Sequence, residues 1–148
     1  MAWESNDGIL LVEDNPNDEE LTIHALKRHN ITNPIHVARD GVEALDFIFG
    51  TDAGPGHSGS LAPRVILLDL KLPLIDGLEV LRRLKTDERT QSIPVVVMTS
   101  SAEDSDLAES YKLGANSYIV KPVDFAQFSE SIRQVGMYWT LLNRPRNA

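Results

Sequence analysis

The sequence predicts an α/β fold in which a parallel sheet is covered by helices on both faces. Five short apolar runs rich in β-branched residues recur along the chain, and segments with helical spacing separate them. The runs do not alternate with polar residues, which is typical of strands buried on both faces. A length of 148 residues fits one domain with a single core. We expect this domain to span residues 1–148, with five βα units and a core over about 8–142.

Each predicted strand is one of the apolar runs. The runs are short and bounded by polar residues, which favours strands over helices. They lie at Ile9–Val12, Ile35–Ala38, Val65–Leu70, Val95–Met98 and Tyr118–Val120.

The first two helices are predicted from their amino-terminal residues. Asn15 is a good N-cap, Pro16 suits the first helical position, and Asp18–Glu20 place acidic side chains where the helix dipole favours them. The second helix begins after Asp40, which opens a capping-box pattern that ends at Glu43. Its apolar positions recur at helical spacing at Val42, Leu45 and Phe49.

The other three helices are predicted from apolar spacing. The fourth ends at Gly114, since glycine is common just past the end of a helix. The fifth carries a continuous apolar stripe whose positions are three or four residues apart. The apolar positions are Leu78, Leu81 and Leu84 in the third helix, Leu107, Ala108 and Tyr111 in the fourth, and Phe125, Phe128, Ile132, Val135 and Trp139 in the fifth.

Two segments lack this periodicity. Residues 50–63 are rich in glycine and proline and are predicted to form a long surface loop, which fits an insertion better than a functional loop. Residues 143–148 are polar and contain Pro145, which predicts a frayed tail.

Composition excludes several classes of function. The chain has no cysteine, so a disulfide framework, a thiolate metal site and a cysteine nucleophile are excluded. A net charge of −8, from 22 acidic and 14 basic residues, would repel a phosphate backbone and argues against direct nucleic acid binding. No apolar run approaches the ~20 residues of a membrane span, and the first residues lack a signal-peptide pattern. We expect a soluble, cytoplasmic protein that makes no membrane contact.

Polar residues gather at the carboxyl ends of the predicted strands, which is where ligands bind to an open parallel sheet. Glu13 and Asp14 follow the first strand, and Asp69 lies at the end of the third. Three carboxylates placed together would repel each other and raise at least one pKa unless a cation joins them. Mg²⁺ suits such a cluster because it accepts one or two carboxylates, water and a phosphate oxygen. Taken singly, Glu13 or Asp14 is equally consistent with a cap of the following helix.

Asp69 follows a buried strand, where an aspartate can be a metal ligand or a nucleophile that forms an aspartyl-phosphate. A cation and a hydroxyl donor would assist that reaction, and Lys121 and Thr99 supply them at neighbouring strand ends. We expect substitutions there to remove few core contacts. Pro122 indicates a constrained backbone beside the lysine. Taken alone, Lys121 is consistent with a surface lysine, and Thr99 with a helix cap that Ser100 could also provide.

These residues lie in motifs that resemble the receiver domains of two-component response regulators. The resemblance covers about residues 8–135 and implies a flavodoxin-like fold with a doubly wound parallel sheet and strand order 2-1-3-4-5. The order and spacing of the motifs make it specific. The motifs are Leu11–Asn15, Leu67–Pro73 with Asp76 and Gly77, Met98–Ser100, and Gly114–Pro122.

The resemblance implies a role for each acidic residue of the site. Asp69 would accept a phosphoryl group from a phosphohistidine of a sensor histidine kinase. Mg²⁺ would be bound by Asp14, by the backbone carbonyl of Lys71 and, mainly through water, by Glu13.

The resemblance also implies how the phosphoryl group is sensed. Thr99 would hydrogen-bond it and Lys121 would pair with it. Tyr118, the aromatic residue three positions before the lysine, would change rotamer as Thr99 moves inward, a shift of population between two conformations. The sequence alone does not separate this switch from a tyrosine packed on the fourth helix.

Three departures refine the resemblance. Glu13 stands where a second aspartate is commoner, Leu72 replaces a frequent methionine, and the loop at 50–63 is longer than in most members. Neither of the two substitutions removes the chemistry. Together with the aromatic end of the fifth helix, Glu13 and the loop make the chain similar to the stand-alone regulators of phytochrome-type histidine kinases.

The end of the fifth helix carries more apolar residues than the sheet needs. With no output domain expected after this helix, the signal would leave through the face formed by the fourth helix, fifth strand and fifth helix. The surplus predicts a homodimer through that face, since large apolar patches usually mark interfaces. Alternatively, the last turn of the fifth helix could fold back on its own domain and cover these apolar side chains without a dimer. The surplus residues are Tyr138, Trp139, Leu141 and Leu142, with Tyr138 and Trp139 as interface residues.

Three other functions share part of the pattern. An aspartate-nucleophile phosphohydrolase of the haloacid-dehalogenase type needs a second aspartate two residues on, where this chain has Lys71, so we expect no turnover of external substrates. A flavodoxin-like redox protein shares the fold, but Glu13 and Asp14 would repel a flavin phosphate. A docking module that works without phosphorylation would not need every site position filled. The four histidines are scattered and predict no metal site.

Overall fold

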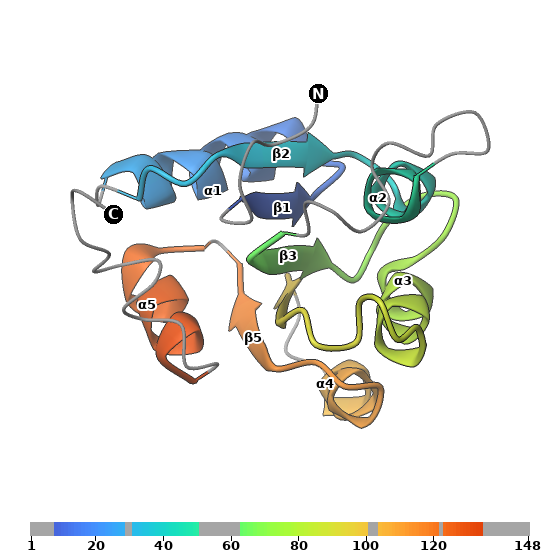
Figure 1. The fold of residues 1–148 in the computed structure, drawn as a ribbon. Coiled ribbons are helices and arrows are strands. Elements are labelled where there is room, and N and C mark those ends of the chain that lie inside the picture. The colour runs from blue at the N-terminus through green and yellow to red at the C-terminus, as the bar shows by residue number, and fades with distance from the viewer. Residues whose placement is uncertain (1–7, 29–30, 51–62, 101–103, 122, 135–148) are drawn as a thin grey trace.

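Five strands and five helices alternate along the described part of the chain (Figure 1). The structure is a computed structural model that describes residues 8–28, 31–50, 63–100, 104–121 and 123–134. The strands are β1 (Ile9–Val12), β2 (Ile35–Ala38), β3 (Val65–Asp69), β4 (Val95–Thr99) and β5 (Ser117–Val120). The helices are α1 (Pro16–Arg28), α2 (Gly41–Phe49), α3 (Gly77–Thr86), α4 (Asp104–Lys112) and α5 (Phe125–Gln134).

The strands form one parallel sheet in the order β2-β1-β3-β4-β5, which confirms the predicted fold and strand order. Three strand ends differ from the prediction by one residue. β3 ends at Asp69. The N–H group of Leu70 donates one more backbone hydrogen bond to the Met98 carbonyl, and the chain turns after this residue. β4 includes Thr99, which pairs with Val120, and β5 begins at Ser117.

Two layers of helices cover the sheet, with α1 and α5 on one face and α2, α3 and α4 on the other (Figure 1). Alternate residues of each strand therefore enter different cores. Ile9 and Leu11 pack in the same core as Phe128 of α5, whereas Leu10 and Val12 pack in the core that contains Val80 of α3. Burial on both faces explains why the strands show no polar alternation.

Side-chain caps fix the helix starts that the sequence predicted. Asn15 Oδ1 accepts from the N–H group of Asp18 at 3.1 Å, and Asp40 Oδ1 accepts from that of Glu43 at 2.7 Å. In a capping box the Glu43 carboxylate would accept from the N–H group of the N-cap residue, Asp40. Here it accepts from the N–H group of Arg39, one residue earlier. These contacts satisfy N–H groups that have no partner within the helix.

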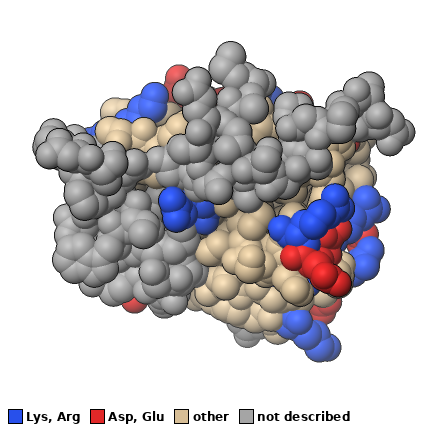
Figure 2. All heavy atoms as spheres, in the orientation of Figure 1, with Lys and Arg blue, Asp and Glu red and all other residues tan. Residues whose placement is uncertain are grey.

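Charged side chains lie close together on the α3 side of the molecule (Figure 2). Arg82 and Arg83 both pair with Glu79, so two guanidinium groups share one carboxylate. None of the helices in the described ranges is long and apolar enough to cross a membrane. Several predicted features lie outside the described residues: most of the loop at 50–63, Pro122, the tail at 143–148, and the surplus residues Tyr138, Trp139, Leu141 and Leu142.

Candidate functional site

The predicted site residues meet at the carboxyl edge of the sheet. Backbone hydrogen bonds across this edge hold the strand ends in register: Glu13 N–H donates to Ala38, and Lys121 N–H donates to Thr99 at 2.8 Å. Glu13 therefore lies directly after β1, Asp69 ends β3, and Lys121 lies directly after β5. The site joins residues more than 100 positions apart in the sequence through the parallel order of the strands.

Three carboxylates form the acidic cluster that the sequence predicted. Glu13, Asp14 and Asp69 each offer an oxygen atom, and these oxygens lie within 4.8 Å of one another. Glu13 and Asp69 are buried and Asp14 is exposed, so the cluster opens to solvent on one side. Glu13 Oε1 is buried without a well-aligned hydrogen bond. Hard, anionic oxygens with an open side are a donor set that Mg²⁺ prefers, and the residues present fit such an ion.

Lys121 places its ammonium group among these carboxylates. Its Nζ atom lies 2.7 Å from Glu13 Oε1 and 2.9 Å from Asp69 Oδ2, and only 10% of its side chain is exposed. Burial lowers the pKa of Lys121, but its hydrogen bonds to Glu13, Asp69 and Asp18 outweigh burial and raise the pKa above its usual range. The group is therefore a permanent positive charge beside Asp69.

Glu13 is the most strongly desolvated acid of the site. Burial raises the pKa of Glu13, the contact with Lys121 lowers it and the nearby charge of Asp69 raises it, and the net result is a pKa of about 7. The charged form of Glu13 is therefore costly in the absence of an additional cation. This cost is the physical reason to expect a divalent ion beside the cluster.

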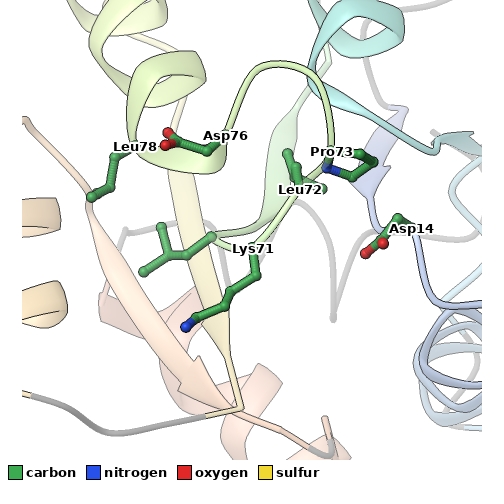
Figure 3. A pocket seen from close by; sticks show the side chains of 7 residues that line it. Asp14, Lys71, Leu72, Pro73, Asp76 and Leu78 are labelled. Atoms are coloured by element: carbon green, nitrogen blue, oxygen red, sulfur yellow. The ribbon is translucent and has the colours of Figure 1, made fainter.

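The loop between β3 and α3 forms the other wall of the site. Lys71 N–H donates to Asp69 Oδ1 at 3.1 Å, which folds the Lys71 backbone back toward the carboxylate. The loop and Asp14 enclose a cleft of about 550 Å³ (Figure 3). Leu74 in this loop has a φ of 69° and is 77% exposed. Of the three clustered carboxylates, Asp14 lines this cleft.

Thr99 and Tyr118 occupy contrasting environments near the site. Thr99 is fully buried at the end of β4, deeper than its position at a strand end predicts. Tyr118 on β5 is 39% exposed and packs edge-on against Tyr111 of α4, with ring centroids 6.0 Å apart. Tyr118 therefore contacts the fourth helix, and its role as a switch stays a prediction.

Asp18 is the site residue that sequence reasoning missed. The sequence analysis assigned it only a favourable place in the first turn of α1. In the structure its Oδ2 atom lies 3.0 Å from Lys121 Nζ, and 31% of its side chain is exposed. The available signal was its position four residues after Asp14, at the start of a helix that begins at the carboxyl edge. The site therefore contains four carboxylates and one ammonium group.

The geometry and the sequence comparison lead to the same family. Residues 9–133 match the response regulator receiver domain family. The chain belongs to this family. The matched range includes every acidic residue of the cluster, Thr99 and Lys121.

Two relatives cover most of this receiver domain and most of their own lengths. The probable methanogenesis regulatory protein FilR2 of Methanothrix harundinacea is 42% identical over 136 residues, which is 92% of this chain and 85% of its own. Response regulator Rcp1 of Synechocystis is 36% identical over 141 residues, which is 94% of each chain.

Solved structures agree with this assignment. The structure of the bacteriophytochrome response regulator AtBRR has a TM-score of 0.82 and 50% identity, with 93% of this chain and 98% of that chain covered. The Mn²⁺-bound form of Rcp1 has a TM-score of 0.71 and 34% identity, with 90% of this chain and 92% of that chain covered. The predicted similarity to phytochrome response regulators is confirmed by AtBRR.

Proposed function

We propose that this receiver domain is the phosphoacceptor of a two-component phosphorelay and that Asp69 is the residue phosphorylated. The observation that carries the proposal is the 2.9 Å distance between Asp69 Oδ2 and Lys121 Nζ, beside a cluster of further carboxylates. A carboxylate oxygen of Asp69 attacks the phosphorus of a phosphohistidine and forms a P–O bond. The P–N bond breaks, and the imidazole nitrogen keeps its electron pair.

Two residues of the chain stabilise the transferred group. The Lys121 ammonium faces Asp69 and neutralises negative charge on the phosphoryl oxygens. Thr99 donates a hydrogen bond from its hydroxyl group at the neighbouring strand end. Lys121 already lies beside Asp69, so little reorganisation of the lysine is needed when the phosphoryl group arrives.

A divalent cation, Mg²⁺, belongs to the proposed site. Asp14, Asp69 and the backbone carbonyl of Lys71 would hold it directly, and Glu13 would hold it mainly through water. When bound, the ion offsets the negative charge of the carboxylates and of the incoming phosphoryl group. The carboxylate oxygens within 4.8 Å of one another and the Mn²⁺-bound form of the related Rcp1 support this assignment.

The signal leaves through the face formed by α4, β5 and α5. Phosphorylation draws Thr99 toward the phosphoryl group, and Tyr118 then turns into the space that Thr99 leaves. In the present structure Tyr118 is partly exposed against Tyr111 of α4, which is the arrangement expected before that change. A change of this kind shifts the population between two conformations of one surface.

The proposed phosphodonor is a sensor histidine kinase of the phytochrome type, in the cytoplasm. The similarity to the bacteriophytochrome response regulator AtBRR supports this choice. Phosphotransfer from a panel of purified histidine kinases tests it: the fastest transfer is expected from a phytochrome-type kinase, and equal or faster transfer from unrelated kinases contradicts it. The acidic chain is proposed to act on protein partners without direct nucleic acid binding.

We also propose a homodimer through the α4, β5 and α5 face, with Tyr138 and Trp139 in the interface. The support is the apolar surplus at the end of the sequence. Sedimentation of the wild type and of the variant Tyr138→Ala/Trp139→Ala tests it, with a dimer expected only for the wild type. A monomeric wild type at tens of micromolar would rule out a dimer with a Kd near ~1 μM.

Intact-mass measurement tests the phosphoacceptor directly. With acetyl phosphate and Mg²⁺, the wild type should gain the mass of one phosphate and Asp69→Asn should gain none. An unchanged yield in Asp69→Asn would overturn the assignment. We expect only self-catalysed phosphotransfer and slow autodephosphorylation. Steady turnover of added phosphate esters would instead favour a phosphohydrolase, and no phosphorylation would favour a docking module.

A further inference from the structure

Asp18 makes a contact that the proposed phosphotransfer does not yet use. It lies in the first turn of α1, and its Oδ2 atom accepts a hydrogen bond from Lys121 Nζ at 3.0 Å. The turn itself is fixed, because Asn15 Oδ1 caps the backbone N–H group of Asp18 at 3.1 Å. A rigid helix start therefore presents the carboxylate to a lysine that follows β5.

The importance of this contact depends on how many hydrogen-bond donors the Lys121 ammonium group has. An ammonium group has three N–H bonds in a fixed tetrahedral arrangement. Lys121 faces three carboxylates, Glu13 at 2.7 Å, Asp69 at 2.9 Å and Asp18 at 3.0 Å. Asp69 and Asp18 accept hydrogen bonds from two of these donors and Glu13 adds a close ion pair, so the three contacts restrict both the position and the rotation of the ammonium group.

The three partners lie on different elements and pull in different directions. Glu13 follows β1 and is fully buried, Asp69 ends β3, and Asp18 lies at the solvent side on α1. Without Asp18, the remaining contacts draw the flexible lysine chain toward the buried pair, and the closest of them is Glu13. Water can occupy the third donor, but a water molecule is not attached to the chain and does not fix its direction.

We propose that Asp18 is a positioning residue of the phosphoryl site, which holds the ammonium group of Lys121 beside Asp69 from the solvent side. It acts through Lys121 and does not touch the transferred group. This inference rests on the proposed function, because it assigns Lys121 to the phosphoryl oxygens. It adds a fourth carboxylate, from the start of α1, to the residues on which the reaction depends.

Three variants separate position from charge. Asp18→Ala removes the acceptor and the charge, whereas Asp18→Asn removes the charge and keeps an acceptor oxygen of the same reach. Glu20→Ala is the matched control, because Glu20 is exposed, lies two residues after Asp18 on α1, and its loss also removes one negative charge. The control accounts for the weaker repulsion of an anionic phosphodonor after one carboxylate is lost.

The first measurement is the rate of Asp69 phosphorylation by acetyl phosphate with Mg²⁺, followed by intact mass. Loss of one charge-assisted hydrogen bond predicts a rate about tenfold lower for Asp18→Ala than for the wild type. Asp18→Asn should stay within about threefold of the wild type, as expected for a retained hydrogen bond, and Glu20→Ala should not fall below it. Equal rates for Asp18→Ala and Asp18→Asn would overturn the proposal.

The second measurement does not require phosphorylation. In ¹⁵N-lysine-labelled protein, the Lys121 ammonium signal should be protected from exchange in the wild type and in Asp18→Asn, and should broaden or vanish in Asp18→Ala. An unchanged signal in Asp18→Ala overturns the positioning role. If Asp18→Ala does not fold, Asp18→Ser replaces it. Failure of the wild type to gain phosphate would refute the proposed function while this signal still tests the position of Lys121.

Discussion

Gly77 marks the closest approach between α3 and the strand that carries Asp69. A Cβ atom at this position would lie 2.3 Å from the carbonyl oxygen of Asp69 and 2.5 Å from the Cα atom of Leu70. Both are backbone atoms, so no side-chain rotation relieves the contact. The Gly77 N–H group also donates to the Leu70 carbonyl at 2.9 Å and holds the segments together. Gly77→Ala therefore moves the backbone of Asp69 without changing any side chain of the site.

The size of the effect follows from that distance. The distance between the new Cβ atom and the Asp69 carbonyl oxygen must increase from 2.3 Å to at least 3.0 Å. Either the backbone of α3 or the backbone at the end of β3 has to move to allow this. Overpacking a dense interior costs about 1–3 kcal/mol, so we expect the free energy of unfolding to fall by about 2 kcal/mol. Displacement of a reacting group by ~1 Å can cost about 10²-fold in rate, so phosphorylation of Asp69 should slow by one to two orders of magnitude.

Gly114→Ala is the control for the loss of stability. Gly114 precedes β5 at the opposite edge of the sheet, has a φ of 111°, and would place a Cβ atom 2.9 Å from Lys85 Cγ. The strained φ alone costs about 1–2 kcal/mol, which matches the cost expected at Gly77. Urea unfolding and the rate of acetyl phosphate labelling are measured for both variants. If Gly77→Ala is labelled as fast as Gly114→Ala, the packing at Gly77 does not position Asp69 and the reasoning is refuted.

Three further predictions concern charge. In EDTA, Lys121→Met should lower the free energy of unfolding by about 3 kcal/mol, because buried Glu13 and Asp69 lose their counter-charge. Adding Glu13→Gln to this variant should restore part of the lost free energy. Urea unfolding measures both effects, and an unchanged unfolding curve for Lys121→Met contradicts the prediction. EDTA should abolish acetyl phosphate labelling and Mg²⁺ should restore it, as intact mass will show. Burial lowers the pKa of His36 in the folded protein below its ordinary value of 6.5. As the pH falls below 6.5, His36 is therefore protonated more readily in the unfolded chain than in the folded one, and the free energy of unfolding decreases. In His36→Gln, the midpoint of urea unfolding should decrease less between pH 6.5 and lower pH than in the wild type.

The fold was predictable because its signals are local. Each strand is an apolar run, and the caps Asn15 and Asp40 need only residues within three positions to act. The ends of the strands were less certain, because hydrogen bonds to a neighbouring strand decide them. Thr99 belongs to β4 since Val120 lies opposite it, and no property of Thr99 alone indicates that pairing.

The site was predictable as a set of strand ends but not as a set of contacts. The carboxyl-edge rule brings Glu13, Asp69 and Lys121 together from spacing alone. The depth of Lys121 does not follow from that rule, since a strand end suggests few core contacts and its side chain is only 10% exposed. Asp18 was missed for the same reason. Which way a first-turn side chain points depends on how α1 lies against β5, and that is a tertiary property.

The three partners of Lys121 also indicate how phosphorylation changes the site. Phosphorylation would remove the negative charge of Asp69, because one carboxylate oxygen becomes the bridging oxygen of an acyl phosphate, and its attraction for the ammonium group would weaken. Glu13 is buried, so the loss of its positively charged partner would be costly. Asp18 keeps its charge and is fixed to α1. If Asp69 is phosphorylated as proposed, we expect the ammonium group to keep its contacts with Glu13 and Asp18 and to exchange the third for a phosphoryl oxygen. We expect propagation from the site to the α4, β5 and α5 face to depend on the proposed movements of Thr99 and Tyr118.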